Sequence, residues 1–328
     1  MDQMMPDTAL DAPIRRFLAH QRTLGRGYIT EEYELRWFQN FLIQVGADDL
    51  DQSVFDRWCE HIKPLSANTR RARQRIVRKL CLHRRRTDPT CFVPNPLYFA
   101  KPQPYRPPAL VTPDQVARML ACVATLPPTP NSPMRSEVLR LAVVLLYTAG
   151  LRRGEVLRLT LSDIDTQAGV IRVRESKFHK TRFVPLSPST NLELRRFLRV
   201  RYAVCEDRRP GAPLLCNRSR GWRPYTGTGL RGGIVRLFDL AGIRDAQGRR
   251  PCVHDLRHSF AVEALTRLYR CGEDVQNRLP HLALYMGHVS IVSTAHYLHF
   301  VPTLAALASE RFARQCGHLI EGVSGEQA

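Results

Sequence analysis

Apolar positions recur with a helical period through most of the chain. Within residues 30–46 they repeat about every four positions, which places them on one face of a helix. These apolar residues are Tyr33, Trp37, Phe41 and Leu42. We expect this helix to begin at Thr30, whose hydroxyl suits an N-cap, and to end at Gly46.

A second helix is predicted over residues 66–86, where Ile76, Val77 and Leu80 stand among basic residues. The stretch from 63 to 86 contains ten Lys and Arg and no Asp or Glu. A solvated helix face is the ordinary interpretation of charged positions, but such faces usually mix both signs. The single sign favours contact with a DNA backbone. The residues expected to make this contact are Arg70, Arg71, Arg75, Arg78 and Lys79.

Prolines mark a boundary after this helix. Seven of them lie between 94 and 113, and because proline fixes φ and lacks a backbone donor, this stretch is expected to be extended. Thr112 then suits an N-cap, with Pro113 at the first helical position and Gln115 three residues after the cap. Two domains are expected for a chain of 328 residues. Their predicted bounds are 1–100 and 112–328, with 101–111 as the linker.

The second domain is predicted to be mainly α-helical with a small β-hairpin. An apolar helix in the segment 136–151 ends at Gly150. Two short strands, 170–174 and 182–186, flank a polar turn. Helical periodicity returns from Leu192 onward, whereas the Gly- and Pro-rich loop that precedes residue 230 is assigned to no element.

Charge narrows the class of partner. With 49 Lys and Arg against 30 Asp and Glu, the net charge is +19, which favours nucleic acid or an anionic membrane surface. The longest apolar run, from Leu141, falls far short of the ~20 residues that span a bilayer, and the first residues do not resemble a secretory signal. Nine cysteines without a C-x-x-C pair indicate reduced thiols. The expected partner is double-stranded DNA, with no membrane, in a bacterial-type cytoplasm associated with the nucleoid.

Candidate catalytic residues fall in four short segments of the second domain. Arg152 follows the glycine that ends the apolar helix, and Glu155 lies three residues on, close enough to hold it. Lys177 opens the turn of the hairpin, where Lys180 is its competitor. Lysines in hairpin turns are commonly solvated, so we choose Lys177 by motif alignment.

The other two segments carry histidines. In HDLRHSF, His254 and Arg257 are three residues apart and share a helix face. In MGHVSIVSTAHYLHF, Tyr297 follows His288 by nine residues. His258 could bind zinc together with His254, but no Cys or carboxylate with ligand spacing accompanies them, so we expect no metal. We interpret His258 as a structural histidine.

These residue types share one chemistry. Arginines offer rigid forks for phosphate oxygens, and histidines donate hydrogen bonds or move protons. A lysine can protonate an alkoxide, and a tyrosine can act as a covalent nucleophile, although a lone tyrosine is more often a core aromatic. Preorganised cations stabilise the charge that builds on a phosphoryl group. If they converge in the fold, they indicate transesterification of a phosphodiester without metal or other cofactor.

Over residues 112–312 the chain resembles the tyrosine recombinases, or phage integrases, and within them the XerC/XerD type of site-specific recombinase. Its segments match, in order, G-L-R-x-x-E, the hairpin K-x(4)-R-x-V-P-L, H-x-L-R-H, and G-H followed nine residues later by tyrosine. Four motifs in this order are specific. The basic N-terminal part resembles the family's helical, SAM-like core-DNA-binding domain in character only. The resemblance implies a mainly α, two-domain, C-shaped DNA clamp.

The resemblance also implies roles for the individual residues. Tyr297 would attack the scissile phosphate, form a 3′-phosphotyrosyl bond and release a 5′-hydroxyl. Arg152 and Arg257 would clamp the non-bridging oxygens with help from His288. Because the phosphotyrosyl bond keeps the energy of the cleaved ester, neither ATP nor a metal would be needed for rejoining.

The remaining roles concern protons and assembly. Lys177 would be the general acid for the leaving oxygen, His254 would assist proton transfer, and Glu155 would support the first arginine. Four protomers would act on two DNA sites as a homotetramer, with an accessory protein or partner recombinase as a further partner. The helical segment after Tyr297 would dock on a neighbouring protomer, although by itself it is an ordinary amphipathic helix.

Two other activities are compatible with the same residues. A type IB topoisomerase-like relaxing enzyme would share the tyrosine and the clamp but act as a monomer without site preference. A non-catalytic DNA-binding regulator could retain the scaffold, although it should have lost some of the catalytic residue types. Covalent capture of DNA by Tyr297 separates the two enzymes from the regulator, and sequence enrichment among the captured DNA ends separates the recombinase from the relaxing enzyme.

Overall fold

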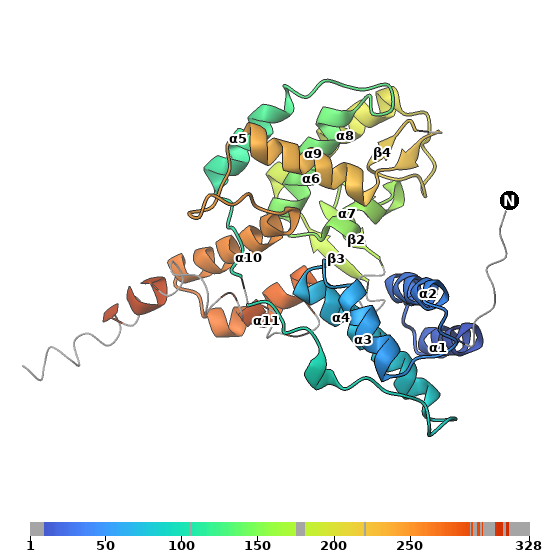
Figure 1. Cartoon of the computed structure of the whole chain (residues 1–328). Helices are drawn as coiled ribbons and strands as arrows, with labels where there is room; N and C mark the ends of the chain where they lie inside the picture. The colour runs from blue at the N-terminus through green and yellow to red at the C-terminus, as the bar shows by residue number, and fades with distance from the viewer. Residues whose placement is uncertain are drawn as a thin grey trace, which may run out of the picture. The chain divides into compact units, whose positions relative to one another are not determined.

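The computed structural model describes residues 10–104, 106–174, 181–219 and 221–288, with 290, 294–295, 297, 306–310 and 313–314. The chain divides into two compact units, Met1–Arg106 and Pro107–Ala328. The part of the chain that the structure describes is mainly helical with two small sheets, as the sequence predicts (Figure 1). No helix within it is both long and apolar enough to cross a membrane.

The first unit is a small helical domain around an aromatic core. Phe38 and Trp58 are fully buried and meet edge to face, with ring centroids 4.9 Å apart. Asp51 and Ser66 cap the two later helices through their side chains. The described elements of this unit are α1 (Asp11–Thr23), α2 (Ile29–Gln44), α3 (Gln52–His61), α4 (Ala67–Arg84) and the 3-10 turn η1 (Pro96–Tyr98).

One prediction about α2 is wrong, and one of its apolar residues is exposed. The helix begins at Ile29 after Tyr28, whose backbone is left-handed with φ 49°, so Thr30 lies inside the first turn and is not the N-cap. Tyr33 is 65% exposed, because the buried stripe runs along a neighbouring line of the helix that includes Leu35 and Phe38. The predicted end of the helix is confirmed.

The basic helix α4 folds as predicted, with Ile76, Val77 and Leu80 buried. Some of its arginines have acidic partners in the fold, although the surrounding sequence contains no Asp or Glu. Arg73 pairs with Glu34, and Arg84 pairs with Asp49, each a carboxylate supplied by another segment of the unit. A run that is single-signed in sequence is therefore partly neutralised in the fold.

The second unit is built around α6 (Arg135–Thr148), most of whose side chains are buried. It packs against α5 (Pro113–Val123), α8 (Pro188–Val204), α9 (Gly227–Leu240) and α10 (Val253–Arg270). Thr112 and Gln115 form the predicted capping box at the start of α5. Val111, just before this cap, donates its backbone N–H to Ser259 Oγ at 2.7 Å and so joins the chain to α10.

The predicted hairpin is present as β2 (Val170–Val173) and β3 (Arg182–Pro185), which pair antiparallel. Ile171 lies opposite Val184, and both are fully buried. A third strand, β1 (Ile164–Asp165), was not expected and pairs with β2. The loop that the sequence left unassigned contains the small pair β4 (Cys216–Asn217) and β5 (Arg223–Pro224).

Candidate active site

The site begins where α6 ends. Gly150 adopts φ +58°, which turns the chain into the short helix α7 (Arg153–Arg158) with Arg152 as its N-cap residue. Glu155 accepts hydrogen bonds from the backbone N–H of Arg152 at 2.9 Å and from its Nη1 at 2.8 Å. The three-residue spacing therefore brings Glu155 onto Arg152, as expected.

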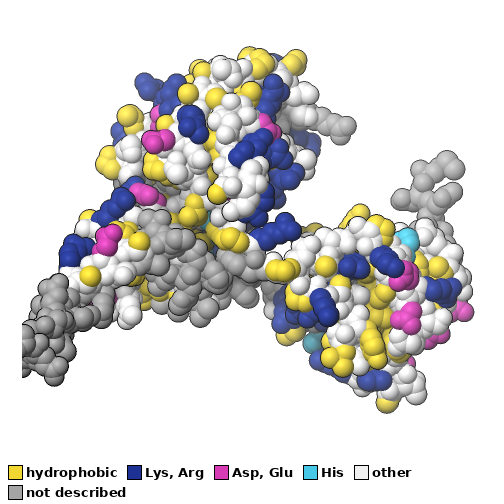
Figure 2. All heavy atoms as spheres, turned by 60° about the vertical axis from the view of Figure 1, so that its left-hand side comes forward, with side chains coloured by type: hydrophobic (Ala, Val, Ile, Leu, Met, Phe, Trp, Pro, Cys, Tyr) yellow, Lys and Arg dark blue, Asp and Glu magenta, His cyan; other side chains and the backbone are white. Residues whose placement is uncertain are grey.

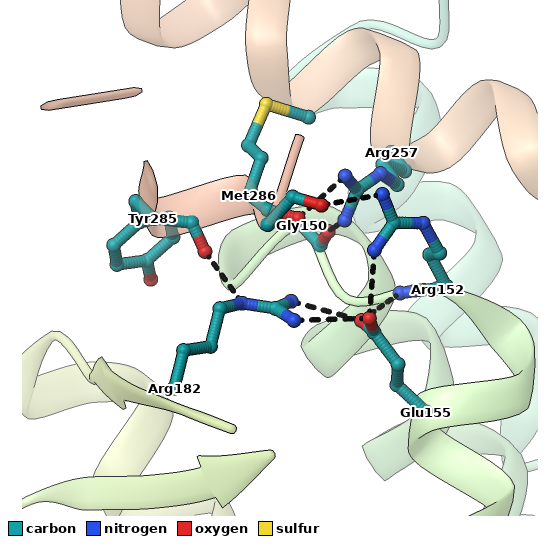
Figure 3. A network of polar contacts seen from close by, with 8 residues as sticks. Gly150, Arg152, Glu155, Arg182, Arg257, Tyr285 and Met286 are labelled. Carbon is teal, nitrogen blue, oxygen red and sulfur yellow. Dashed lines mark hydrogen bonds and ion pairs between the residues drawn. The ribbon is translucent and has the colours of Figure 1, made fainter. Parts of the chain in front are cut away.

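Arg182 on β3 binds the same carboxylate from the other side (Figure 3). Its Nη1 and Nη2 donate to the two oxygens of Glu155 at 3.0 and 2.9 Å, a bidentate pair. Its Nε donates to the backbone oxygen of Tyr285 at 2.9 Å. The sequence assigns no role to Arg182, although it is the arginine of the hairpin motif. Its position in that motif is the signal that could have identified it as a site residue.

Glu155 is almost completely buried, with 2% of its surface exposed. Burial alone would raise its pKa, but the hydrogen bonds from Arg182 and Arg152 prevail and lower the pKa of Glu155 to about 2. The carboxylate is therefore charged at neutral pH and compensates part of the charge of the two arginines.

Arg257 and Arg152 are also held by backbone carbonyls. Arg257, on α10, is 1% exposed and donates Nη1 to Gly150 O and Nη2 to Met286 O, the latter at 2.7 Å. Arg152 donates Nη2 to Gly287 O at 2.8 Å. The oxygens of 286 and 287 lie at the C-terminal end of α11 (Val275–Met286), where a helix presents unpaired carbonyls and partial negative charge.

These contacts position two guanidinium groups side by side (Figure 3). Burial, with the nearby charge of Arg152, lowers the pKa of Arg257 to about 9. Arg257 remains a cation at neutral pH. The described side chains of this network include three guanidinium groups, those of Arg152, Arg182 and Arg257, and the single carboxylate of Glu155, which pairs with the first two. Positive charge is therefore in excess and suits an anion.

Gly287 makes the close approach of these residues possible. It ends α11 with φ +67°, a left-handed conformation. A Cβ atom there would lie 2.7 Å from Arg182 Nη1, well inside contact distance. Glycine is therefore required both for the turn and for the position of the Arg182 guanidinium.

His288 and Tyr297 lie next to this network. His288 Nδ1 is 2.6 Å from the hydroxyl oxygen of Thr294, and burial together with Arg257 lowers the pKa of His288 to about 4. The imidazole is therefore neutral at physiological pH. Tyr297 is 5% exposed and close enough to Arg257 for a charge on the phenol to raise the pKa of that arginine.

The hydroxyl of Tyr297 is hydrogen-bonded to His258, with Nδ1 and Oη 2.6 Å apart. From the sequence, His258 is interpreted only as a structural histidine. The clue was its position, since it follows Arg257 directly and stands four residues after His254. His254 is exposed, and its ring centroid is 4.5 Å from that of His258. Partial desolvation and the charge of Arg257 lower the pKa of His254.

The other predicted site residues fall in two groups. Lys177 and the competing Lys180 lie outside the described residues. In the predicted DNA-binding set on α4, Arg75 and Lys79 are exposed, and Arg70 is partly buried. The two others make contacts inside their own unit. Arg71 donates to Ala100 O at 3.1 Å, and Arg78 donates to Pro94 O.

Metal ligands were expected to be absent. The described part of the chain contains no group of three or more His, Cys, Asp or Glu side chains that could hold a metal ion.

The sequence is similar to that of known proteins. The model of the phage integrase family matches residues 110–302. The integrase/recombinase y4rE of Sinorhizobium fredii is 30% identical over 310 residues, which cover 92% of this chain and 95% of that protein. Tyrosine recombinase XerA of Thermococcus kodakarensis is 30% identical over 224 residues, 67% of this chain and 66% of that protein.

Solved structures share the fold. The Tn1549 transposon integrase in complex with a circular intermediate DNA matches with a TM-score of 0.64 and 21% sequence identity, over 93% of this chain and 100% of that chain. The XerH site-specific recombinase bound to a palindromic substrate matches with a TM-score of 0.60 and 16% identity, over 94% and 97% of the two chains.

Proposed function

This chain belongs to the phage integrase family and is a site-specific DNA recombinase, and we propose that Tyr297 is the nucleophile with which it cuts DNA. The phenol oxygen attacks the scissile phosphate and forms a 3′-phosphotyrosyl bond, and the 5′-oxygen leaves. Rejoining reverses these steps with a different 5′-hydroxyl. Since the covalent bond keeps the energy of the ester, the reaction needs neither ATP nor a metal.

The convergence of Tyr297 with the arginines is the observation that supports this proposal. The chain supplies Arg152 from the start of α7, Arg257 from α10 and the tyrosine from a segment 40 residues beyond that arginine. The guanidinium groups would hold the two non-bridging oxygens, where charge builds in the transition state. Their positions are fixed in advance by carbonyls and by Glu155, so little reorganisation is needed.

The proton donors have distinct roles in this proposal. Neutral His288, whose Nδ1 faces Thr294, would donate a hydrogen bond from Nε2 to a non-bridging oxygen. Lys177 would protonate the leaving 5′-oxygen as general acid, and His254 would assist proton transfer at the exposed side of α10. Glu155 would keep Arg152 in place.

DNA would be held mainly through its phosphates. In the smaller unit we assign this contact to the predicted residues on α4, above all the exposed Arg75 and Lys79. In the larger unit, Lys and Arg side chains gather along the right-hand edge in Figure 2, and Arg153 and Arg158 of α7 are exposed. Such contacts make affinity fall steeply with salt.

The proposed assembly follows from strand exchange. Two duplexes supply four cleavage sites, so four protomers would act together as a homotetramer, with an accessory protein or partner recombinase as a further component. The work would take place in the cytoplasm on nucleoid DNA. The units before and after residue 106 would be the core-DNA-binding and catalytic domains.

Covalent trapping tests the nucleophile. Nicked DNA from a sequence library is incubated with wild-type protein and with Tyr297→Phe, and denaturant-resistant adducts are counted and their DNA ends sequenced. We expect adducts with wild type, enrichment of one sequence, and none with Tyr297→Phe despite unchanged DNA affinity. Tyr269→Phe, in the same unit, serves as the matched control and should behave as wild type.

Other outcomes separate the rival activities. Adducts without sequence enrichment would support a topoisomerase-like enzyme. Intact DNA binding without any adduct would support a non-catalytic regulator. Adducts formed equally by Tyr297→Phe would contradict the assignment of the nucleophile.

A further inference from the structure

We propose that His258 is the base that takes the proton from Tyr297 when the tyrosine attacks DNA, an inference that rests on the proposed role of Tyr297 as nucleophile. His258 touches the reacting oxygen directly. Its Nδ1 lies 2.6 Å from the phenol oxygen, within the heavy-atom distance of 2.6–3.2 Å that proton transfer requires.

The neighbouring histidines are engaged elsewhere. His288 Nδ1 binds the hydroxyl of Thr294 at 2.6 Å. His254 is exposed and packs edge to face on His258, with an interplanar angle of 84°. The structure thus provides three histidines with three different partners: a hydroxyl next to the arginines, another imidazole, and the nucleophile itself.

The helix that carries His258 holds it firmly. Asp255, in the first turn of α10, accepts a hydrogen bond from the backbone N–H of Cys252 at 2.7 Å and so caps the helix. Ser259, on the other side of His258, bridges Asp255 O and the backbone of Val111. Arg257, the residue before, is locked by two carbonyls. One turn of helix therefore positions the base for the nucleophile and an arginine for the phosphate.

The step is balanced as follows. Before attack, Nδ1 of His258 carries no proton and accepts the hydrogen bond of the phenol, so its ring proton is on Nε2. As the bond between Oη and phosphorus forms, the phenol proton passes to Nδ1, and the bond from phosphorus to the 5′-oxygen breaks. The leaving oxygen takes its proton from the general acid. In rejoining, the 5′-hydroxyl gives its proton to the deprotonated general acid as its oxygen bonds to phosphorus, and the imidazolium of His258 returns its proton to the phenol oxygen as the phosphotyrosyl bond breaks.

The decisive experiment is single-turnover cleavage of a nicked substrate by His258→Ala and His258→Asn. Asparagine places its amide oxygen near the position of Nδ1, so it can still accept the hydrogen bond of Tyr297 but cannot hold the proton. We expect both variants to cleave about 10²–10⁴-fold more slowly, the usual contribution of a general base. His281→Ala, an exposed histidine on α11, should cleave like wild type. Melting temperature and DNA affinity confirm folding, and if the alanine variant does not fold, the asparagine variant carries the test.

A second substrate separates the nucleophile from the leaving group. In a 5′-bridging phosphorothiolate a sulfur replaces the leaving oxygen, and a thiolate leaves without being protonated because its conjugate acid is far stronger than an alcohol. Loss of the general acid, as in Lys177→Ala, should be rescued by this substrate. Loss of His258 should not be rescued.

Three results would overturn the proposal, and each can be distinguished from the others. Cleavage by His258→Asn at the wild-type rate would reduce His258 to a positioning residue. Rescue of His258→Ala by the phosphorothiolate would move its action to the leaving group. A wild-type protein that forms no adduct would instead refute the proposed function as a whole, whatever the variants do.

Discussion

At the scale of single residues, Glu155 connects two arginines of the site. One buried carboxylate accepts two hydrogen bonds from Arg182 and two from Arg152, one of them from its backbone. Removing one partner of a buried charge network leaves the other charges uncompensated, which costs more than the network contributes as a whole. The arginines therefore depend on Glu155 both for position and for charge balance.

This dependence predicts a pH effect on stability. The pKa of Glu155 is about 2 in the folded protein and near its ordinary value of 4.5 when unfolded. A lowered pKa stabilises the fold above the unfolded value, and this stabilisation disappears as pH falls through the folded value. Wild type should lose about 3 kcal/mol by this route, and Glu155→Gln should lack that loss. Urea unfolding at neutral and acidic pH measures this loss of stability. The control is Glu193→Gln, because Glu193 forms a more exposed ion pair with Arg140. Equal losses in wild type and Glu155→Gln would contradict the prediction.

Gly287 leads to a second prediction at this scale. Gly287→Ala strains a left-handed backbone by about 1 kcal/mol and drives a Cβ against Arg182, so DNA cleavage should fall. Gly272→Ala is the matched control, because Gly272 follows α10 with φ +72° and a Cβ there would meet nothing within 4 Å. Gly272→Ala should lose only the stability that the strained backbone costs, and Gly287→Ala should lose more in thermal unfolding because its Cβ also displaces Arg182. Equal cleavage by the two would show that the guanidinium is not displaced.

Single residues also show which contacts of the site can be predicted from the sequence. The pair of Arg152 and Glu155 was predictable because three positions of one helical turn connect them. The contacts of Arg182 and His258 were not, because their partners lie 27 and 39 residues away and are brought near only by the packing of α11, β3 and the tyrosine segment. Local spacing carries no information about such distances.

At the scale of elements, the best predictions were those with a local cause. The capping box at α5, the apolar helix α6 and the hairpin strands follow from residues adjacent in sequence. The start of α2 did not, since the chain begins that helix from a left-handed Tyr28 without a side-chain cap. The two-residue strands β4 and β5 are too short to show an alternation of apolar and polar positions.

The helix α4 illustrates why residue type alone does not assign a contact. Arg75→Ala and Lys79→Ala should each reduce the slope of log affinity against log salt by about 1, with stability unchanged. Arg78→Ala should mainly destabilise the smaller unit, because its guanidinium holds a backbone carbonyl. Filter binding over a salt series measures the slopes. Arg36→Ala, at an exposed arginine paired with Glu32, should leave the slope unchanged. Wild-type slopes for the α4 variants would exclude that helix from the interface.

At the scale of the whole molecule, the chain forms two units with separate hydrophobic cores. The larger unit carries every described member of the candidate site, and the smaller unit carries the basic helix. Composition predicted a polyanionic partner and proline predicted a boundary, because charge and linker chemistry are properties of whole segments. Neither composition nor the position of the prolines predicts how several chains assemble.

The segment after Tyr297 provides the test of assembly. Deleting residues 303–328 should leave DNA binding by a single protomer largely intact and prevent the ordered tetramer on paired sites. Light scattering of protein with site DNA measures the mass of the complex, with the full-length chain as reference. An unchanged mass after deletion would rule out docking of this segment on a neighbouring protomer.

The carbonyl oxygens that hold Arg152 and Arg257 affect which contacts of the site can be detected by comparing related sequences. Every amino acid carries a backbone oxygen, so exchange of Met286 for another residue leaves the acceptor in place. Such a contact produces no paired substitutions between lineages, and comparison of relatives by correlated change would not detect it. What these carbonyls contribute to holding Arg152 and Arg257 is therefore transmitted through the path of the main chain, whereas the contact of Arg152 with Glu155 depends on side chains that leave a visible trace in the sequence.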